Sequence, residues 1–411
     1  MSFESDNAKQ LAKQIISQGI PHPEETIPPI SISSRALGIS NGGFEHMCWD
    51  IVSKATKTKS QHYKDAYLKS TRTIIYSLIV AGFSFTHLAL GTRIKPDSYL
   101  ASLGLTRRHI EAITTALIES EYAILSRGGY RHHGSPHLSK ATQYFPTEKL
   151  LTNYCELLYE PIGDFDSYEA YVFKGSNRWE DSWESKALTI HRYNEFMRNF
   201  TWAKKAPTHR SLGEEPFTSG RMYTPYQNIV NRRVSIRTQT LLNGQPLVEV
   251  DFKSNHLWLL AAFFGEDLPN DPYLDIAEKI GCSRDAVKRL LNPLLGAKHK
   301  RQLAEIKFKL HDIDNDLIDE ILASLDTTLP WLKKHNLLFK AVGTRLQYIE
   351  GEVALRMFEW GVREGIPLIN IHDAFAVNLE HRTKAHEAMH QFRDDVIKEM
   401  QWFIPHFAKE S

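Results

Sequence analysis

The second half of the chain contains two stretches in which a strand pattern is followed by a turn and another strand pattern. In the first, alternating apolar runs flank Asn243-Gly244, a dipeptide typical of two-residue β-hairpin turns. The second run, PLVEVDF, delivers Asp251 at its end and is followed by the apolar segment HLWLLAAFF, which predicts a helix packed on the sheet. In the second stretch, GIPLINIHDAFAVNLE, the pair His372-Asp373 lies at the predicted turn. These patterns predict an α+β fold with an antiparallel sheet in which two aspartates lie at strand ends.

The two aspartates are candidate metal ligands. Carboxylates from adjacent strands of one sheet can lie close enough to share hard cations, and Mg²⁺ suits them because it completes its shell with water and phosphate. Two such ions stabilise the attacking and leaving oxygens of an in-line displacement at phosphorus, the reaction of nucleotide addition. We therefore predict that Asp251 and Asp373 hold two Mg²⁺ ions, for which Mn²⁺ can substitute. Taken singly, either aspartate is more often a turn or cap former.

Between these aspartates, the segment DPYLDIAEKIGCSRDAVKRLLNPLLGAKHKR predicts helices with a basic face. Ser283 can cap a helix on which Arg284 and Lys288 stand four residues apart, hence on one face. Two cations one turn apart can hold a triphosphate and neutralise a leaving pyrophosphate. Taken alone, such a pair is more often a solvated helix face, and its position between the two aspartates favours the binding role.

Several further residues occur in a fixed order with these. They are Gly220-Arg221, Gln227-Asn228-Ile229, Arg233, Ile236-Arg237, Asp251, Arg284, Lys288, Gln347 and His372-Asp373. Over residues 216–385 this order resembles the palm and fingers of the family A polymerases, the DNA polymerase I group, and of their relatives, the single-subunit phage-type RNA polymerases. It is also similar to uncharacterised family members of phages, plasmids and integrative elements. The resemblance implies a palm over residues 216–411 with a helical fingers insertion at about 265–345.

The resemblance also implies roles for individual residues. Asp251 and Asp373 would be the catalytic metal ligands, and the Phe252 carbonyl an additional one. Arg284 and Lys288 would hold the phosphates of the incoming nucleotide. The residues implied to contact the primer-template duplex are Arg221, Gln227, Asn228, Arg237, Gln347 and His372.

The sequence departs from the family pattern at three places. His256 stands where the DNA-synthesising relatives have a glutamate that helps to exclude the ribose 2′-hydroxyl, and Gly296 falls where they have a supporting aromatic residue. His256 is bulky enough to crowd a 2′-hydroxyl, which favours deoxynucleotides, although an imidazole can also hydrogen-bond to that group. Ala374 replaces an acidic neighbour of the second aspartate, as a small residue does in the phage RNA polymerases.

The first half of the chain predicts three further regions. Residues 1–60 include a proline-rich stretch and are expected to form a loosely held arm. Residues 61–150 have the order helix, turn, helix and two strands, which is typical of a winged-helix domain. Residues 151–215 are helical in pattern and are interpreted as a connector that could act like a polymerase thumb. No set of carboxylates for a proofreading exonuclease is found among the first 215 residues.

The predicted winged helix carries candidate DNA contacts. Its second helix begins at Thr106, and a basic hairpin tip follows. Such modules dock on duplex DNA through phosphates or base edges, but others contact proteins or are purely structural. The candidate contacts are Arg107, Arg108, Arg127, Arg131 and Lys140. The nearby His132, His133 and His137 are interpreted as solvated loop residues, because no carboxylate or cysteine set accompanies them.

Composition limits the remaining possibilities. The 411 residues have a net charge of only +1, so any nucleic-acid binding depends on local clusters. Cys48, Cys155 and Cys282 are too far apart for a zinc site or a disulfide framework and are expected to be buried. The chain has no secretory signal pattern and no apolar run long enough for a membrane span, so we expect a cytoplasmic protein without a membrane partner.

The resemblance implies a DNA-dependent DNA polymerase that acts in the replication of a mobile element or phage, with nucleoside triphosphates and a primer-template as partners. We expect it to lack proofreading. Two alternatives remain open. One is a primase or single-subunit RNA polymerase on the same palm, and the other is a non-catalytic DNA-binding initiator or regulator.

Overall fold

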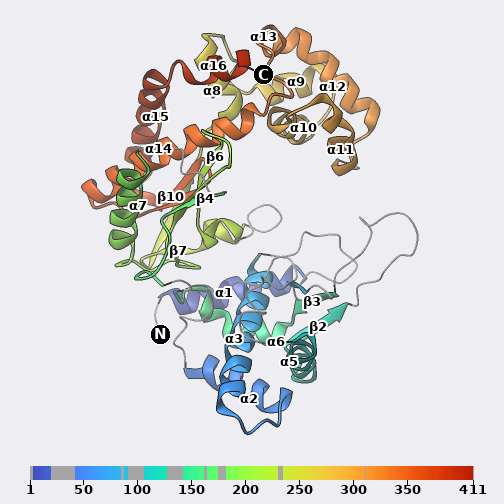
Figure 1. Ribbon diagram of the computed structural model, residues 1–411, viewed down its shortest axis with the longest axis vertical. Coiled ribbons are helices and arrows are strands. Elements are labelled where there is room, and N and C mark those ends of the chain that lie inside the picture. The colour runs from blue at the N-terminus through green and yellow to red at the C-terminus, as the bar shows by residue number, and fades with distance from the viewer. Residues whose placement is uncertain are drawn as a thin grey trace. The chain divides into compact units, whose positions relative to one another are not determined.

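The computed structural model describes residues 3–19, 42–84, 88–90, 106–126, 142–161, 164–174, 182–229, 235–310 and 312–410. The chain forms two compact units, which are taken separately below (Figure 1). The first unit consists of Met1–Tyr168, Arg198–Pro207 and Thr224–Val248. The second consists of Glu169–Met197, Thr208–Tyr223 and Glu249–Ser411. The chain therefore passes between the units several times, whereas the sequence analysis placed four consecutive regions along it.

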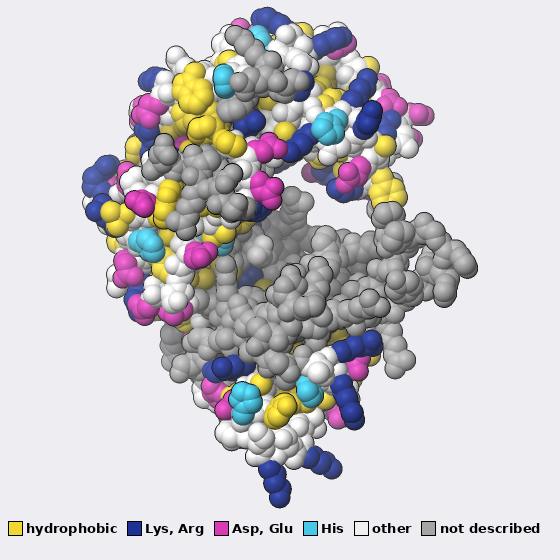
Figure 2. All heavy atoms as spheres, in the orientation of Figure 1, with side chains coloured by type: hydrophobic (Ala, Val, Ile, Leu, Met, Phe, Trp, Pro, Cys, Tyr) yellow, Lys and Arg dark blue, Asp and Glu magenta, His cyan; other side chains and the backbone are white. Residues whose placement is uncertain are grey.

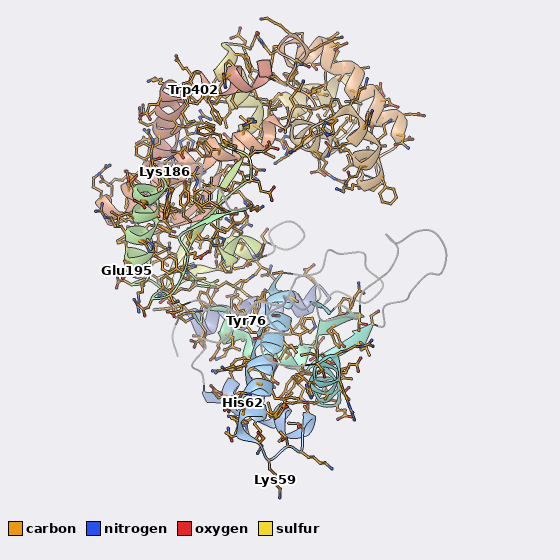
Figure 3. All side chains as sticks on the ribbon, in the orientation of Figure 1. Lys59, His62, Tyr76, Lys186, Glu195 and Trp402 are labelled. Carbon is orange, nitrogen blue, oxygen red and sulfur yellow. The ribbon has the colours of Figure 1, made fainter. Side chains whose placement is uncertain are left out.

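The first unit is mainly helical. Its helices are α1 (Phe3–Ser17), α2 (Gly42–Ala55), α3 (Gln61–Phe83), α5 (Arg107–Glu119) and α6 (Glu148–Tyr154), which continues into the 3₁₀ turn η3 (Cys155–Leu158). The long helix α3 runs from exposed residues such as His62 to a buried second half that includes Tyr76 (Figure 3). Helices α2 and α5 pack against it and against each other. The apolar second half of α3 thus forms a core, as its pattern predicts.

The described residues of the N-terminal region form helices rather than the loosely held arm that is predicted over residues 1–60. Residues 3–17 and 42–55 are the helices α1 and α2, and each buries an apolar face. In α1 the buried residues Ala8, Leu11 and Ile15 recur three and four positions apart, which is the spacing of one helix face. The proline-rich stretch lies within residues 20–41, outside the described residues.

The region expected to be a winged helix contains α5 followed by strands β2 (Ala123–Ser126) and β3 (Thr142–Pro146). With β1 (Leu88–Leu90) they form an antiparallel sheet of order β1-β3-β2. Thr106 begins α5 as expected, in a capping box with His109. The helix expected before it and the hairpin tip, with Arg127, Arg131, Lys140 and the three loop histidines, lie outside the described residues.

The last segment of the first unit contains a β-hairpin. Strands β7 (Leu241–Leu242) and β8 (Gln245–Val250) pair antiparallel, with Asn243 (φ 52°) and Gly244 (φ 73°) as a two-residue turn. Both turn residues have the positive φ of a type I′ turn, which confirms the predicted hairpin. The Asn243 amide donates to the Thr201 carbonyl at 2.6 Å, which ties residues 198–207 to this hairpin.

The second unit contains two groups of strands and a long central helix. Strands β4 (Tyr171–Phe173), β5 (His209–Leu212) and β6 (Ser219–Tyr223) form one sheet, in which β4 and β5 are parallel and β5 and β6 antiparallel. Strands β9 (Leu368–Ile371) and β10 (Ala374–Asn378) form a hairpin, and the end of β8 neighbours β10. The structure is therefore mixed α+β with mainly antiparallel sheets, which confirms the coarse class.

The helices of the second unit cover these strands and fill the segment between β8 and β9. They are α7 (Trp183–Met197), α8 (Asn255–Phe264), α9 (Pro272–Ile280), α10 (Arg284–Gly296), α11 (Leu303–Lys309), α12 (Asn315–Thr328), α13 (Pro330–Lys334), α14 (Val342–Glu364), α15 (Arg382–Glu399) and α16 (Phe403–Glu410). Helix α14 packs against β6, α7 and α15, which makes it the central element of the unit.

Close contact between α14 and β6 depends on two glycines. A Cβ on Gly351 would lie 1.9 Å from the Gly220 carbonyl oxygen, so only glycine fits there. The fully buried Arg210 donates to Glu352 at 2.7 Å, and Lys186 donates to the same carboxylate at 2.8 Å. The close approach of α14 to β6 brings the residue after Gly220 and the residue before Gly351 next to each other.

Charged side chains of both signs are mixed over the face drawn in Figure 2, in keeping with the net charge of +1. Cys48 and Cys155 are buried as expected, whereas Cys282 is partly exposed, and all three are free thiols. Among the described residues, no helix is both long enough and apolar enough to cross a membrane.

Candidate active site

Asp373 lies in the tight turn between β9 and β10. Ile371 pairs with Ala374, which leaves His372 and Asp373 as the two turn residues, and His372 has the left-handed φ of 58°. The buried side chain of Asn370 donates to the His372 carbonyl at 3.0 Å. This hydrogen bond holds the turn in place and with it the direction of the Asp373 side chain.

Asp251 follows directly after β8, whose end neighbours β10. Burial, together with the negative charges of Glu350 and Asp251, raises the pKa of Asp373 from 3.8 to about 7. Burial also raises the pKa of Asp251, while the positive charge of Lys288 opposes that rise. The two aspartates are therefore close enough to repel each other, and the structure brings together the pair that the sequence analysis selected.

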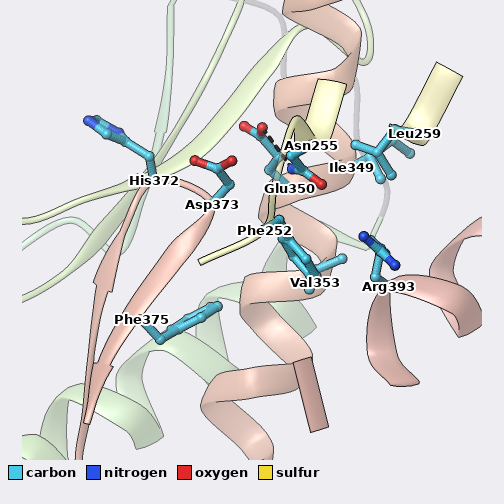
Figure 4. A pocket seen from close by; sticks show the side chains of 10 residues that line it. All are labelled: Phe252, Asn255, Leu259, Ile349, Glu350, Val353, His372, Asp373, Phe375 and Arg393. Atoms are coloured by element: carbon cyan, nitrogen blue, oxygen red, sulfur yellow. Dashed lines mark hydrogen bonds between the residues drawn. The ribbon is translucent and has the colours of Figure 1, made fainter. Parts of the chain in front are cut away.

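A third carboxylate, Glu350 of α14, lines the same pocket as Asp373 and His372 (Figure 4). The Glu350 side chain is 1% exposed and accepts hydrogen bonds from Arg221 of β6 and from Asn255 of α8, the latter at 3.2 Å. The Nε2 atom of His256 lies 2.9 Å from its Oε1 atom. Burial alone would raise the pKa of Glu350, but His256 and Arg221 lower it to about 2, so Glu350 stays ionised.

Glu350 is not among the site residues predicted from the sequence, although the sequence carries a signal for it. Glu350 lies four residues after Leu346 and three before Val353, on the buried stripe of α14. A charged residue on an apolar stripe requires a partner, because burying an unpaired carboxylate is costly. That signal predicts a partner but does not identify it.

The donor set at the aspartates fits a hard divalent cation. Glu350 is engaged by Arg221 and His256, which leaves the two carboxylates of Asp251 and Asp373. Two carboxylates with open positions for water and phosphate oxygens are the ligands that Mg²⁺ takes, and a cation between them would relieve the repulsion that raises the pKa of Asp373. Within the described part of the chain, no group of three or more His, Cys, Asp or Glu residues is arranged to hold a metal ion.

Helix α10 presents the two expected basic residues. Ser283 caps it as predicted, accepting from the Ala286 amide at 3.1 Å. Arg284 donates to Asp271 at 2.7 Å and lies over the Tyr273 ring. Lys288 is exposed, and its charge acts on Asp251, so it is the member of the pair that faces the aspartates.

The residues expected to contact a primer-template duplex are divided between the units. Arg221, Gln347 and His372 lie in the second unit, with Arg221 bonded to Glu350, Gln347 partly buried on α14 and His372 exposed at its turn. Gln227 and Asn228, in the 3₁₀ turn Pro225–Asn228, and Arg237, which begins a second such turn, belong to the first unit. Arg237 donates to the Gln227 carbonyl at 3.2 Å.

His256 and Gly296, the positions that depart from the family pattern, lie on different helices. His256 is in the first turn of α8 with its ring 14% exposed, and Gly296 is the last residue of α10. Phe252 is buried beside Asp251 and lines the same pocket as Asp373. Of the winged-helix candidates, Arg107 is paired with Glu111 at 2.6 Å and Arg108 is exposed.

No protein-family model matches this chain, and no curated protein or solved structure matches it either.

Proposed function

We propose that this protein is a template-directed nucleotidyltransferase, a DNA polymerase without proofreading that is related to family A and replicates a phage or mobile element. The observation that carries the proposal is the position of Asp251 and Asp373 at the ends of neighbouring strands, where the negative charge of Asp251 helps to raise the pKa of Asp373. Lys288 acts on Asp251 from the fingers-like helix α10, and Arg221 lies within the electrostatic reach of Asp373. Catalytic carboxylates with cations beside them suit phosphoryl transfer.

Each group has a definite task in this proposal. Asp251 and Asp373 would hold two Mg²⁺ ions, which when bound stabilise the charge on the attacking and leaving oxygens. The primer 3′-hydroxyl loses its proton to solvent water, and its oxygen forms a bond to the α-phosphorus. The bond from that phosphorus to the bridging oxygen breaks, and pyrophosphate leaves with the electron pair. Lys288 and Arg284 bind the triphosphate and neutralise the charge on the leaving group. Arg221 and Gln347 of the second unit contact the primer-template.

The contact between His256 and Glu350 favours deoxynucleotides. Because Nε2 of His256 is held at 2.9 Å from Glu350, the ring is fixed in position and that nitrogen is not available to a ribose hydroxyl. A fixed ring excludes a 2′-hydroxyl by its bulk. His256→Ala should therefore raise the incorporation of ribonucleotides relative to deoxynucleotides by about tenfold. A wild-type protein that uses ribonucleotides alone and needs no primer would instead be a primase or RNA polymerase.

Primer extension in the presence of Mg²⁺ tests the proposal. Asp251→Asn and Asp373→Asn should each reduce the extension rate by about 10³-fold or more, because each removes a charged metal ligand. Glu278→Gln, a change at an exposed carboxylate of α9, is the matched control and should leave the rate unchanged. A wild-type protein that binds DNA well but extends no primer on any template would support the initiator or regulator function.

A further inference from the structure

A second cavity adjoins Asp251 on the side of helix α15. It has a volume of about 250 Å³ and is lined mainly by donor groups. Those that carry the argument are Lys253, Ser254, His386, His390 and Arg393. Among the described residues that line it, Asp251 is the one carboxylate.

Arg393 is a buried cation whose counter-ion, Asp394, is distant and half exposed. It is 6% exposed, and its guanidinium lies 3.2 Å from the centre of the Trp258 ring. The centre of the Phe252 ring, which lines the same pocket as Arg393 in Figure 4, is 4.5 Å from the guanidinium. Within the part of the chain that the structure describes, its Nε atom has no hydrogen-bond partner. The Asp394 carboxylate is 3.7 Å away and half exposed. Burial lowers the pKa of Arg393 to about 10, although the negative charge of Asp394 opposes that fall.

Arg210 is a second deeply buried arginine of this unit, and hydrogen-bond acceptors compensate its charge. Arg210 is fully buried and donates to the Glu352 carboxylate at 2.7 Å, to the Tyr171 hydroxyl at 2.9 Å and to the Gly220 carbonyl at 2.8 Å. A buried guanidinium ordinarily requires such a set of acceptors. Among the described residues, the polar partners of Arg393 are Nδ1 of His390 and the half-exposed carboxylate of Asp394, so an anion in the cavity would complete its environment.

The neighbouring groups also favour an anion. His386 and His390 lie with ring centres 4.3 Å apart, and Nδ1 of His390 is 3.2 Å from Arg393. Burial lowers the pKa of His390, as do the charges of Arg393 and His386. The buried hydroxyl of Ser254 has no hydrogen-bond partner among the described residues. These groups all offer hydrogen-bond donors toward one space, as a ligand with several oxygens requires.

We infer that this cavity is a phosphoanion subsite that receives pyrophosphate from the reaction at Asp251. The inference rests on the proposed function for its biological role, because nucleotide addition releases pyrophosphate beside the two aspartates. The cavity shares Asp251 with that site, so the product would have only a short path to it. Arg393, His386, His390 and Lys253 then bind the anion, and Ser254 donates a neutral hydrogen bond.

Calorimetric titration of the full chain with sodium pyrophosphate in EDTA tests this subsite. The wild-type protein should bind, and both Arg393→Met and the double variant His386→Ala/His390→Ala should bind about tenfold more weakly, because each loses hydrogen-bond donors to the anion. The histidine variant leaves the stack of Arg393 on Trp258 intact, so it remains informative if Arg393→Met does not fold. Lys398→Ala removes a charge from the same helix without lining the cavity and should bind like the wild type.

Three results would overturn the inference: no binding to the wild type, equal affinity in the histidine variant, or inorganic phosphate binding as tightly as pyrophosphate. The titration contains no nucleotide, template or metal, so its outcome does not depend on whether the protein extends a primer. Loss of extension with intact pyrophosphate binding would remove the proposed function alone. Primer extension without pyrophosphate binding would remove the subsite alone.

Discussion

His256 and Glu350, on helices α8 and α14, are joined by a 2.9 Å contact between Nε2 and Oε1. Arg221 of β6 binds the other oxygen of the same carboxylate. Three elements that are distant in sequence are thus tied together at one buried charge, next to Asp373. Glu350 is therefore a positioning residue for Arg221 and His256, the two side chains that flank the proposed metal site.

Comparing substitutions of Glu350 and Glu352 separates the effect of Glu350 on stability from its effect on the selection between ribonucleotides and deoxynucleotides. Glu350→Gln and Glu352→Gln should each lower the free energy of unfolding by about 2 to 4 kcal/mol, because each removes a buried charge from its partners. Glu352 contacts Arg210 and Lys186 but not His256. Only Glu350→Gln should therefore alter the ratio of ribonucleotide to deoxynucleotide incorporation. Urea unfolding and single-nucleotide incorporation measure the two effects, and an equal change of the ratio in both variants would refute the positioning role.

The pKa of Asp373 predicts how metal-free stability depends on pH. Because the pKa of Asp373 is raised from 3.8 to about 7 in the folded state, the folded protein keeps a proton that the unfolded chain has lost between these values. The free energy of unfolding should therefore fall as pH rises from about 4 to 7. Asp373→Asn should flatten this fall, and Asp275→Asn, at an exposed site on α9, should not. Unfolding curves in EDTA at several pH values give the slopes, and identical slopes for Asp373→Asn and the wild type would contradict the assignment.

Lys288 and Arg289 are adjacent on α10 but differ in their partners. Both guanidinium Nη atoms of Arg289 are bound to Asp312, at 2.6 and 2.7 Å, whereas the charge of Lys288 acts on Asp251. Lys288→Ala should raise the nucleotide KM and reduce kcat, lowering kcat/KM about 10- to 100-fold, because the lysine meets charge that grows in the transition state. Arg289→Ala should change kcat/KM by less than about twofold. Steady-state incorporation kinetics on the two variants test this, and equal effects would remove Lys288 from the site.

The first unit offers a separate test of duplex binding. The Arg107→Ala/Arg108→Ala variant should bind duplex DNA more weakly, with a slope of log K against log salt that is shallower by about 1 to 2. Since Arg107 is already paired with Glu111, Arg108→Ala alone should account for most of the change. Lys149→Ala, at a lysine that is paired with Glu121, serves as the control. An unchanged slope in the double variant would make α5 a structural element.

Features encoded by neighbouring residues could be predicted from the sequence. Asn243-Gly244 forms the hairpin turn, and His372-Asp373 forms the turn between β9 and β10. Ser283 caps α10 because its side chain needs only the amide of Ala286, three residues on. Each of these signals lies within a few residues of the feature that it specifies, so no knowledge of the tertiary fold is required.

Features that depend on distant residues could not be predicted. Glu350 and Arg221 are 129 positions apart, and their contact depends on the approach of α14 to β6 at Gly351 and Gly220. The pairing of the Arg198–Pro207 segment with the β7–β8 hairpin likewise depends on tertiary contacts, and for this reason the unit boundaries differ from the expected ones. The helix α1 was missed for another reason: its apolar spacing was present but was outweighed by the proline-rich stretch that follows.

The central claim is that Asp251 and Asp373 together hold the catalytic cations. The most direct test is a crystal of the protein with a dideoxy-terminated primer-template, the matching deoxynucleoside triphosphate and Mn²⁺, measured at the manganese absorption edge. We predict two anomalous peaks, each at roughly 2.1 Å from oxygens of one or both aspartates, and their loss in Asp373→Asn. Anomalous density located elsewhere, or unchanged in that variant, would contradict the account.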